Sequence, residues 1–118
     1  MSEKQPRRIS SEEREHFVRS GFSGDIYVEP KDDLGFSALM VDVFDSHPLK
    51  QMVGATRSYL VLSGVGKFQL NGEGFDVGEG DLIIIPDGGV YKYQGIMRLF
   101  ELNVPATTSA NSITLEEQ

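Results

Sequence analysis

The sequence contains no cysteine and no tryptophan, and two of its 118 residues are histidine. Without cysteine the chain has no disulfide, no thiolate metal ligand and no cysteine nucleophile. With two histidines, a serine–histidine–acid triad has few ways to form. The sequence also lacks any apolar run near the roughly 20 residues that a membrane helix needs. We therefore expect a soluble protein with no membrane segment.

Positive charge is scarce as well. The chain carries 11 lysines and arginines against 18 acidic residues, which gives a formal net charge of −7. Such a surface repels nucleic acid and anionic lipid, although a local cationic pocket is compatible with it. The first residues, MSEKQPRRISSEERE, have no apolar segment behind their basic residues, so they do not resemble a secretory signal. We expect a cytoplasmic protein that binds neither nucleic acid nor membrane.

The chain has the size of one domain, which buries roughly two-thirds of its unfolded surface. We expect residues 1–24 to form an N-terminal arm and a short helix, and residues 25–105 to form a β-domain. The segment 106–118 is rich in small polar residues, which predicts a flexible tail. Ser10 and Glu13 have the spacing of a capping box, which predicts that the short helix begins there and runs to about Arg19.

From residue 25 onward, short runs rich in β-branched and aromatic residues alternate with Gly, Pro, Asn and Asp. That spacing predicts an all-β sandwich or barrel. Asn71 and Gly72 tolerate the positive φ of a tight turn, so they predict a hairpin. The run from Leu82 to Ile85 is apolar at every position, so both of its faces should be covered. One face would meet the barrel interior and the other a second layer or a partner subunit, which favours a homodimer.

The stretch GDLIIIPDGGVYKYQG resembles the second motif of the cupins, a family of small jelly-roll β-barrels, also called double-stranded β-helices. That motif is a glycine, five residues, a proline, one residue, a glycine, two residues, a histidine, three residues and an asparagine. Gly80, Pro86 and Gly88 match it, whereas Tyr91 and Gly95 stand at the histidine and asparagine positions. Upstream, RSYLVLSGVGKFQLNGE resembles the end of the first motif. The resemblance covers about residues 36–104 and implies a cupin β-barrel preceded by the short helix.

In metal-binding cupins the first motif supplies two histidines and a glutamate that point into the barrel. The glutamate position of this sequence is Arg57. The two histidine positions are Lys50 and Met52, or Gln51 and Val53, depending on the length of the gap between them. Because a transition-metal site needs several imidazole or carboxylate donors, the resemblance implies a cupin without a metal or another cofactor.

His47 is the remaining metal candidate, and it would need a shift of the loop DSHPLKQMVGA by about three residues. A histidine before a proline is more often a turn or surface residue, and we expect that here. His16, on the expected helix, should face solvent.

Strand alternation places Arg57 and Tyr59 on one face, and likewise Tyr91 and Tyr93. If the cupin geometry applies, these four side chains line the mouth of the barrel, with Lys50 as a further candidate whose direction depends on the gap. An arginine where a metal-binding carboxylate would stand reverses the charge of the site, and it binds carboxylate or phosphate in a bidentate way. The pocket should then favour an anionic or sugar-like molecule.

Each of these residues also has a structural interpretation. Arg57 could be paired with an acidic neighbour, which would satisfy its charge without any ligand. The acidic candidates are Asp42, Asp45 and Glu101. The tyrosines could fill the barrel with their hydroxyls bonded to the backbone. We expect this filling role for Tyr93 and a pocket role for Tyr91.

Three functions remain open. The first is a metal-free cupin that binds a small anionic or sugar-like molecule without catalysis. The second is a metal-independent isomerase, epimerase or lyase in which Arg57 holds the substrate and stabilises a Tyr91 phenolate. The third is a structural dimer without a working site. A fold does not fix a function, so whether the protein is an enzyme stays undecided by the sequence.

Overall fold

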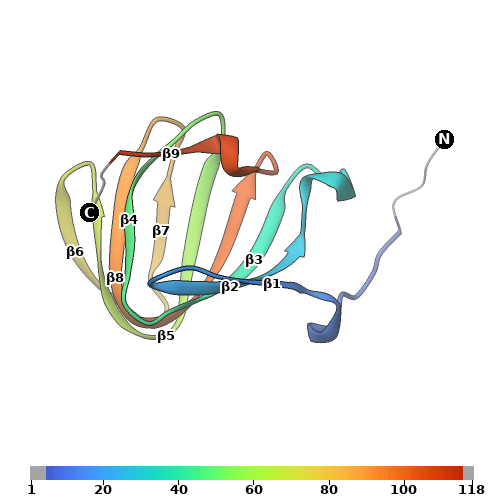
Figure 1. Ribbon diagram of the computed structural model, residues 1–118, viewed down its shortest axis with the longest axis horizontal. Helices are drawn as coiled ribbons and strands as arrows, with labels where there is room; N and C mark the ends of the chain where they lie inside the picture. The colour runs from blue at the N-terminus through green and yellow to red at the C-terminus, as the bar shows by residue number, and fades with distance from the viewer. Residues whose placement is uncertain (1–4, 116–118) are drawn as a thin grey trace.

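The computed structural model describes residues 5–115, which form an almost entirely β structure (Figure 1). The strands are β1 (Glu15–Val18), β2 (Phe22–Val28), β3 (Ser37–Val43), β4 (Ser46–Met52), β5 (Thr56–Leu70), β6 (Glu73–Gly78), β7 (Leu82–Ile85), β8 (Val90–Val104) and β9 (Ser112–Thr114). The short 3₁₀ turns are η1 (Ser11–Glu13), η2 (Pro30–Asp32) and η3 (Ser109–Asn111). Within the described chain no helix is both long and apolar enough to cross a membrane.

Two long antiparallel strands, β5 and β8, hold the barrel together. They pair from Thr56 opposite Val104 to Leu70 opposite Tyr91. The C-terminal half of β8 also pairs with β3, and its N-terminal half pairs with β4. In the same way β5 pairs first with β7 and then with β6. The two strands thus belong to both walls, and their bends close the sheet into the jelly-roll barrel expected from the sequence.

The bend is made possible by glycines where β5 and β8 cross closely. Gly66 lies opposite Gly95, and a Cβ on Gly95 would come 2.6 Å from the Cα of Gly66. Gly64 and Gly95 both have positive φ, at 86° and 142°. A side chain at these positions would push the strands apart, which is the usual reason for glycine at a barrel corner.

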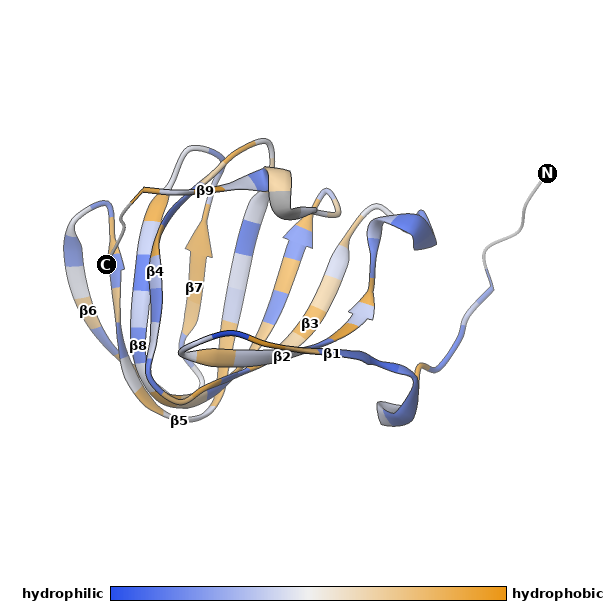
Figure 2. Ribbon diagram, in the orientation of Figure 1, coloured by the Kyte–Doolittle hydropathy of each residue, from blue (hydrophilic) through white to orange (hydrophobic). Residues whose placement is uncertain are grey.

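The hairpin expected at Asn71 and Gly72 is confirmed. Both residues have positive φ, and they connect Leu70 to Glu73 in the β5–β6 pair. In β7 the apolar residues alternate between two environments, although Figure 2 shows the strand as uniformly hydrophobic. Ile83 and Ile85 are buried in the core, whereas Leu82 and Ile84 on the outer face are 60% and 54% exposed. The chain itself therefore covers the inner face of β7, as expected, whereas the outer face of β7 is exposed to solvent.

The N-terminal helix is shorter than the sequence suggested. The Glu13 carboxylate does accept a hydrogen bond from the Ser10 backbone N–H at 3.2 Å, as in a capping box, but the helical turn ends at Glu13. The next residues form β1, which pairs with β2 from Glu15 opposite Ile26 to Val18 opposite Ser23. Aromatic and β-branched residues in β1 fit a paired strand better than a helix, and tertiary pairing overrides the capping signal.

The segment after Pro105, expected to be a flexible tail, contains the turn η3 and the strand β9, and its residues 116–118 lie outside the described part. Thr107 approaches Ser37, whose hydroxyl lies 3.3 Å from the Thr107 hydroxyl. The strand β9 then pairs with β4, with Ile113 opposite Gln51. Backbone pairing therefore orders a segment whose side chains bury little apolar surface.

Candidate functional site

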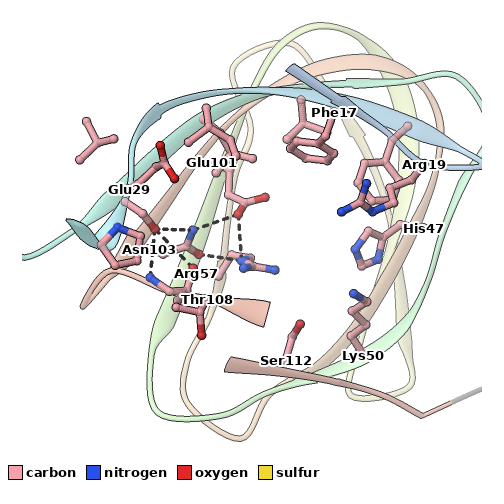
Figure 3. Close-up of a pocket in the computed structure, with 18 of the residues that line it drawn as sticks. Phe17, Arg19, Glu29, His47, Lys50, Arg57, Glu101, Asn103, Thr108 and Ser112 are labelled. Atoms are coloured by element: carbon pink, nitrogen blue, oxygen red, sulfur yellow. Dashed lines mark hydrogen bonds and ion pairs between the residues drawn. The ribbon is translucent and has the colours of Figure 1, made fainter. Parts of the chain in front are cut away.

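A cavity of about 420 Å³ lies inside the barrel (Figure 3). Its walls come from β1 to β5, from β8 and from the segment that leads into β9. Aromatic and aliphatic side chains such as Phe17, Phe22 and Leu39 line part of it, and charged or amide side chains line the rest. Small-molecule sites commonly combine a concave apolar wall with a few polar groups in this way.

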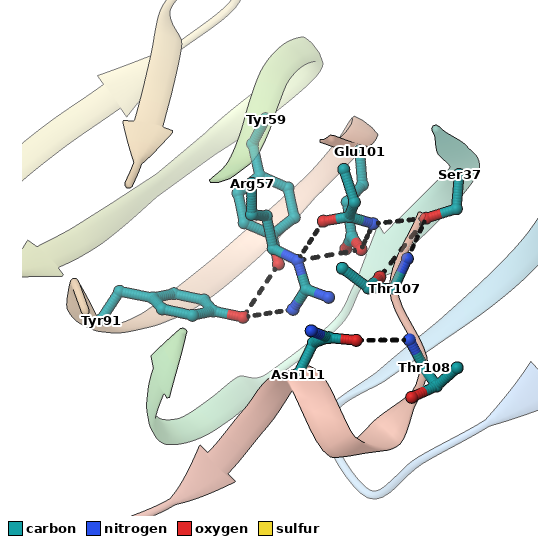
Figure 4. Close-up of polar contacts among 9 residues, drawn as sticks. Ser37, Arg57, Tyr59, Tyr91, Glu101, Thr107, Thr108 and Asn111 are labelled. Atoms are coloured by element: carbon teal, nitrogen blue, oxygen red, sulfur yellow. Dashed lines mark hydrogen bonds and ion pairs between the residues drawn. The ribbon is translucent and has the colours of Figure 1, made fainter. Parts of the chain in front are cut away.

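Arg57 is the centre of a polar cluster at one side of the cavity (Figure 4). Its Nε donates to Asn103 Oδ1 at 2.6 Å and lies 3.2 Å from Glu101 Oε2. One of its terminal nitrogens donates to the Tyr91 hydroxyl at 2.7 Å. Burial opposes the charge of the guanidinium, but Glu101 and the tyrosines outweigh it and raise the pKa of Arg57. The guanidinium is therefore charged and compensated by Glu101, as in the pairing interpretation.

The same cluster continues to the edge of the barrel through Asn103. Its amide donates to Glu101 Oε2 at 2.9 Å and to the Ser37 hydroxyl at 3.2 Å. The Ser37 hydroxyl in turn accepts from the backbone N–H of Thr107 at 3.2 Å. These bonds fix the rotamers of Arg57, Glu101 and Asn103 before any ligand binds. A preorganised set of donors and acceptors loses little entropy when a ligand binds.

The three inner tyrosines are buried and protonated. The hydroxyls of Tyr59 and Tyr91 lie 3.3 Å apart. Burial raises the pKa of each of Tyr59, Tyr91 and Tyr93, and for Tyr91 the opposing effect of Arg57 is smaller than that of burial. A Tyr91 phenolate is thus disfavoured, contrary to the sequence-based idea that Arg57 would stabilise one. These hydroxyls are suited to donating a hydrogen bond or a proton.

His47 is buried among the aromatic rings, and the expectation of a turn or surface residue is wrong. Its ring stacks on Tyr93 at a centroid distance of 4.5 Å and on Tyr91 at 5.2 Å, and 5% of the residue is exposed. Nδ1 lies 2.8 Å from the Pro48 carbonyl, which fixes the tautomer with hydrogen on Nδ1. Burial, followed by the charge of Lys50, lowers the pKa of His47 to about 3. The imidazole is therefore neutral, with Nε2 as an available acceptor.

Arg19 and Lys50 form the side of the cavity around His47 (Figure 3). Lys50 lies on β4, and Arg19 lies in the turn between β1 and β2, where its backbone N–H donates to the Phe22 carbonyl at 2.8 Å. Burial, then Arg57 and Arg19, lower the pKa of Lys50. This side of the cavity is basic, whereas the opposite side holds Glu101 with its partners.

Comparison with known proteins agrees with the architecture. The family model of the AraC-like ligand binding domain matches residues 59–97. Among solved structures, the cupin domain of Schizosaccharomyces pombe Cnp3 is similar with a TM-score of 0.65 and 19% identity, over 71% of this chain and 64% of that one. This chain has the cupin fold. KdgF from Halomonas sp. is similar to it with a TM-score of 0.76 and 17% identity, over 90% of this chain and 99% of that one.

A more similar structure is that of Pac13 from Streptomyces, described as a nucleoside dehydratase. With uridine bound it has a TM-score of 0.85 and 26% identity to this protein, over 96% of this chain and 93% of that one. Three of the similar Pac13 structures with uridine are variants in which a histidine or a tyrosine is replaced. A search of curated proteins found no match to this chain.

The structure brings together the residues that the sequence singled out. Arg57, Tyr59 and Tyr91 are joined by hydrogen bonds, and Tyr93 contacts Tyr59 with ring centroids 5.4 Å apart. Tyr93 lines the cavity, whereas Tyr91 is fully buried behind the cavity wall. The sequence had predicted the opposite, a pocket role for Tyr91 and a filling role for Tyr93. Lys50 lines the cavity. His16 is on β1 with its side chain largely exposed, and its Nδ1 lies 2.7 Å from Asp25 Oδ1.

Sequence reasoning missed Asn103, Ser37 and Arg19, and it named Glu101 only as a partner of Arg57. Alternation along β8 could have found two of them, because Glu101 and Asn103 stand at even spacings from Tyr91 and therefore share its inward face. No such signal marks Arg19, which was expected on a helix. Within residues 5–115 no group of three or more His, Cys, Asp or Glu side chains is arranged to hold a metal ion.

Proposed function

We propose that this cupin is a metal-independent cytoplasmic protein that binds a nucleoside or a related sugar-bearing molecule in the barrel cavity. The observation that carries the proposal is the preorganised cluster of Arg57, Glu101 and Asn103 beside the aromatic wall. Sugar hydroxyls need both donors and acceptors, and the cluster offers an unused guanidinium nitrogen and a carboxylate. The flat rings of Phe22 and Tyr93 suit the stacking of a planar base. The similarity to uridine-bound Pac13 supports the same class of ligand.

Uridine should stabilise the protein if this proposal holds. At 100 times its dissociation constant, a ligand that binds the native state adds about 2.7 kcal/mol to the free energy of unfolding. We expect Ser112→Trp to remove this stabilisation, because Ser112 lines the cavity and the indole would fill it. The measurement is thermal unfolding with and without uridine and other nucleosides and sugars.

The matched control is Ile113→Trp, which changes the neighbouring residue of β9, half exposed and absent from the cavity wall. It should keep the stabilisation. Equal loss in both variants would mean that binding occurs outside the barrel. No stabilisation by any nucleoside or sugar would favour the third hypothesis, a structural cupin without a working site.

A metal-independent lyase is the second candidate, and the state of His47 favours it. Its neutral imidazole presents Nε2 as a base, while the protonated hydroxyl of Tyr93, which lines the cavity, is a donor. Such a pair could remove a proton from a carbon next to a carbonyl and protonate a departing hydroxyl. In deuterated water, wild-type protein should then exchange that hydrogen in a carbonyl-bearing sugar derivative. His47→Gln should bind the same molecule without exchange, and exchange at the wild-type rate in the variant would exclude His47 as the base.

We also propose a homodimer formed through the outer face of β5, β7 and β8. Cross-strand neighbours Leu82, Leu60 and Phe100 form an apolar row there, and Ile84 extends it. Exposed apolar rows of this kind commonly mark subunit contacts. Sedimentation at micromolar concentration should give a dimer for the wild type and a monomer for Leu82→Glu. Ile96→Glu, at an exposed apolar residue outside the row, should stay dimeric. A monomeric wild type would reject the dimer.

A further inference from the structure

The two sides of the cavity differ in how their charges are balanced. On one side Arg57 is compensated by Glu101, with Nε and Oε2 3.2 Å apart. On the other side Arg19 and Lys50 line the cavity, and in Figure 3 the ring of His47 lies between them. Because His47 is neutral, this side carries two positive charges and no negative one.

Neither of these two cations has a carboxylate partner within 4.0 Å in the described part of the chain. The Arg19 guanidinium donates to the Val18 carbonyl at 3.1 Å and stacks over the Phe17 ring at 4.7 Å. Other cations do have carboxylate partners, such as Lys67 with Asp76 at 3.4 Å and Arg98 with Asp42 at 2.8 Å. In a protein with a net charge of −7, two unpaired cations in one cavity call for a ligand that supplies the missing charge.

Both cations are held in place by the fold. Lys50 lies on β4 between two paired strands, opposite Tyr91 on β8 and Thr114 on β9. Arg19 is fixed by the turn that closes the β1–β2 hairpin and by its contact with Phe17. Burial, then the charges of Arg57 and Arg19, lower the pKa of Lys50, and the opposing effect of Glu101 is smaller than these. The cations at this side of the cavity therefore repel one another. An anion placed there would relieve this repulsion.

We propose that the molecule bound in the cavity carries an anionic group, phosphate or carboxylate, that lies between Arg19 and Lys50, with its neutral sugar part toward Arg57 and Glu101. The proposal rests on the proposed function, in which the cavity holds a sugar-bearing molecule. It places the anion away from Arg57, where the sequence had suggested it, because Glu101 already neutralises that guanidinium. A nucleoside monophosphate or a sugar phosphate fits this arrangement better than an uncharged nucleoside.

Such an anion would also change His47. The charge of Lys50 is the second cause of the low pKa of His47 after burial, and Arg57 adds to it, while the Pro48 carbonyl opposes it. The tyrosine rings stacked on the imidazole are neutral. An anion beside Lys50 would offset that charge and raise the pKa of His47, while the larger effect of burial stays in place. The bound substrate would in this way strengthen the base that acts on it.

The test compares uridine, uridine 5′-monophosphate and inorganic phosphate by calorimetric titration. The monophosphate should bind wild-type protein at least about tenfold more tightly than uridine, the gain of one good charge-assisted contact. Lys50→Met and Arg19→Gln should each lose most of this gain and keep uridine affinity within about twofold. Lys67→Met, which removes a lysine outside this cavity, should retain it.

A second titration compares glucose with glucuronate, which differs from it by a carboxylate. Equal affinity of the wild type for uridine and its monophosphate would overturn a phosphate ligand. Equal affinity for glucose and glucuronate as well would overturn the anion site altogether. A loss of the same size in Lys67→Met would show a general charge effect and also reject the site. The same measurements distinguish a failure of the proposed function from a failure of the anion site. If uridine does not bind but phosphate stabilises wild type and not Lys50→Met, the anion site stands and the nucleoside is wrong.

Discussion

Replacing Arg57 by methionine is expected to lower the free energy of unfolding by about 3–5 kcal/mol, the usual result of removing one member of a buried ion pair. The side chains of Arg57 and Glu101 are 12% and 8% exposed. The substitution leaves Glu101 charged without its main partner, and it deprives Asn103 and Tyr91 of a donor. Most of this loss of stability comes from the buried polar groups that are left without a partner, and less from the lost attraction between Arg57 and Glu101. Urea unfolding at pH 7 measures it.

A double variant separates these two contributions. In Arg57→Met/Glu101→Leu no charge is left uncompensated, so the loss should be clearly smaller than the sum of the two single losses. Arg98→Met is the matched control, because Arg98 pairs with Asp42 at 2.8 Å on the surface, with its side chain 55% exposed. An exposed pair of this kind contributes at most about 1 kcal/mol. Similar losses for Arg57→Met and Arg98→Met would show that burial of the cluster is unimportant.

The barrel could be predicted from the sequence because its turns depend on local chemistry. Gly80 and Gly88 have φ of 93° and 89°, which strongly favour glycine, and Asn71 with Gly72 closes the β5–β6 hairpin. Alternation also placed Arg57 with Tyr59, and Tyr91 with Tyr93, on shared inward faces. Signals of this kind act within a few residues of each other, so a single sequence contains them.

The β4 side of the site could not be predicted for a specific reason. Between His47 and Lys50 the pairing with β8 shifts, because three steps on β4 match the two steps from Tyr93 to Tyr91. This bulge lets both His47 and Lys50 reach the cavity, although simple alternation would put them on opposite faces. Counting residues along the cupin motif could not reveal the extra residue that this bulge inserts in β4. Arg19 was missed for a related reason, since only the pairing of β1 with β2 brings it to the cavity.

These two surprises change the chemistry assigned to the barrel. From the sequence, Arg57 was either the cation that binds the ligand or the partner of an acidic residue, and Tyr91 was the candidate reactive group. In the structure Arg57 belongs to a balanced cluster, Tyr91 is locked behind it, and the unbalanced cations are Lys50 and Arg19. His47, placed among them as a neutral ring, becomes the group with a free acceptor. The side of the cavity that holds the neutral imidazole and the unpaired cations is therefore formed by β4 and the β1–β2 turn.

The neutrality of His47 should be visible as a loss of stability in acid. The folded pKa of about 3 lies below the ordinary value of 6.5, so between these values the unfolded chain binds a proton that the native protein does not. The stabilising contribution is complete above about pH 6.5 and is lost as the pH falls toward 3. From pH 7 to pH 4 it amounts to about 3 kcal/mol of the free energy of unfolding. His47→Gln lacks this contribution, so its stability should fall by about that much less over the same range in urea unfolding. His16→Gln removes the exposed imidazole as a control, and an equal change in acid sensitivity in both variants would mean that the burial of His47 is not its cause.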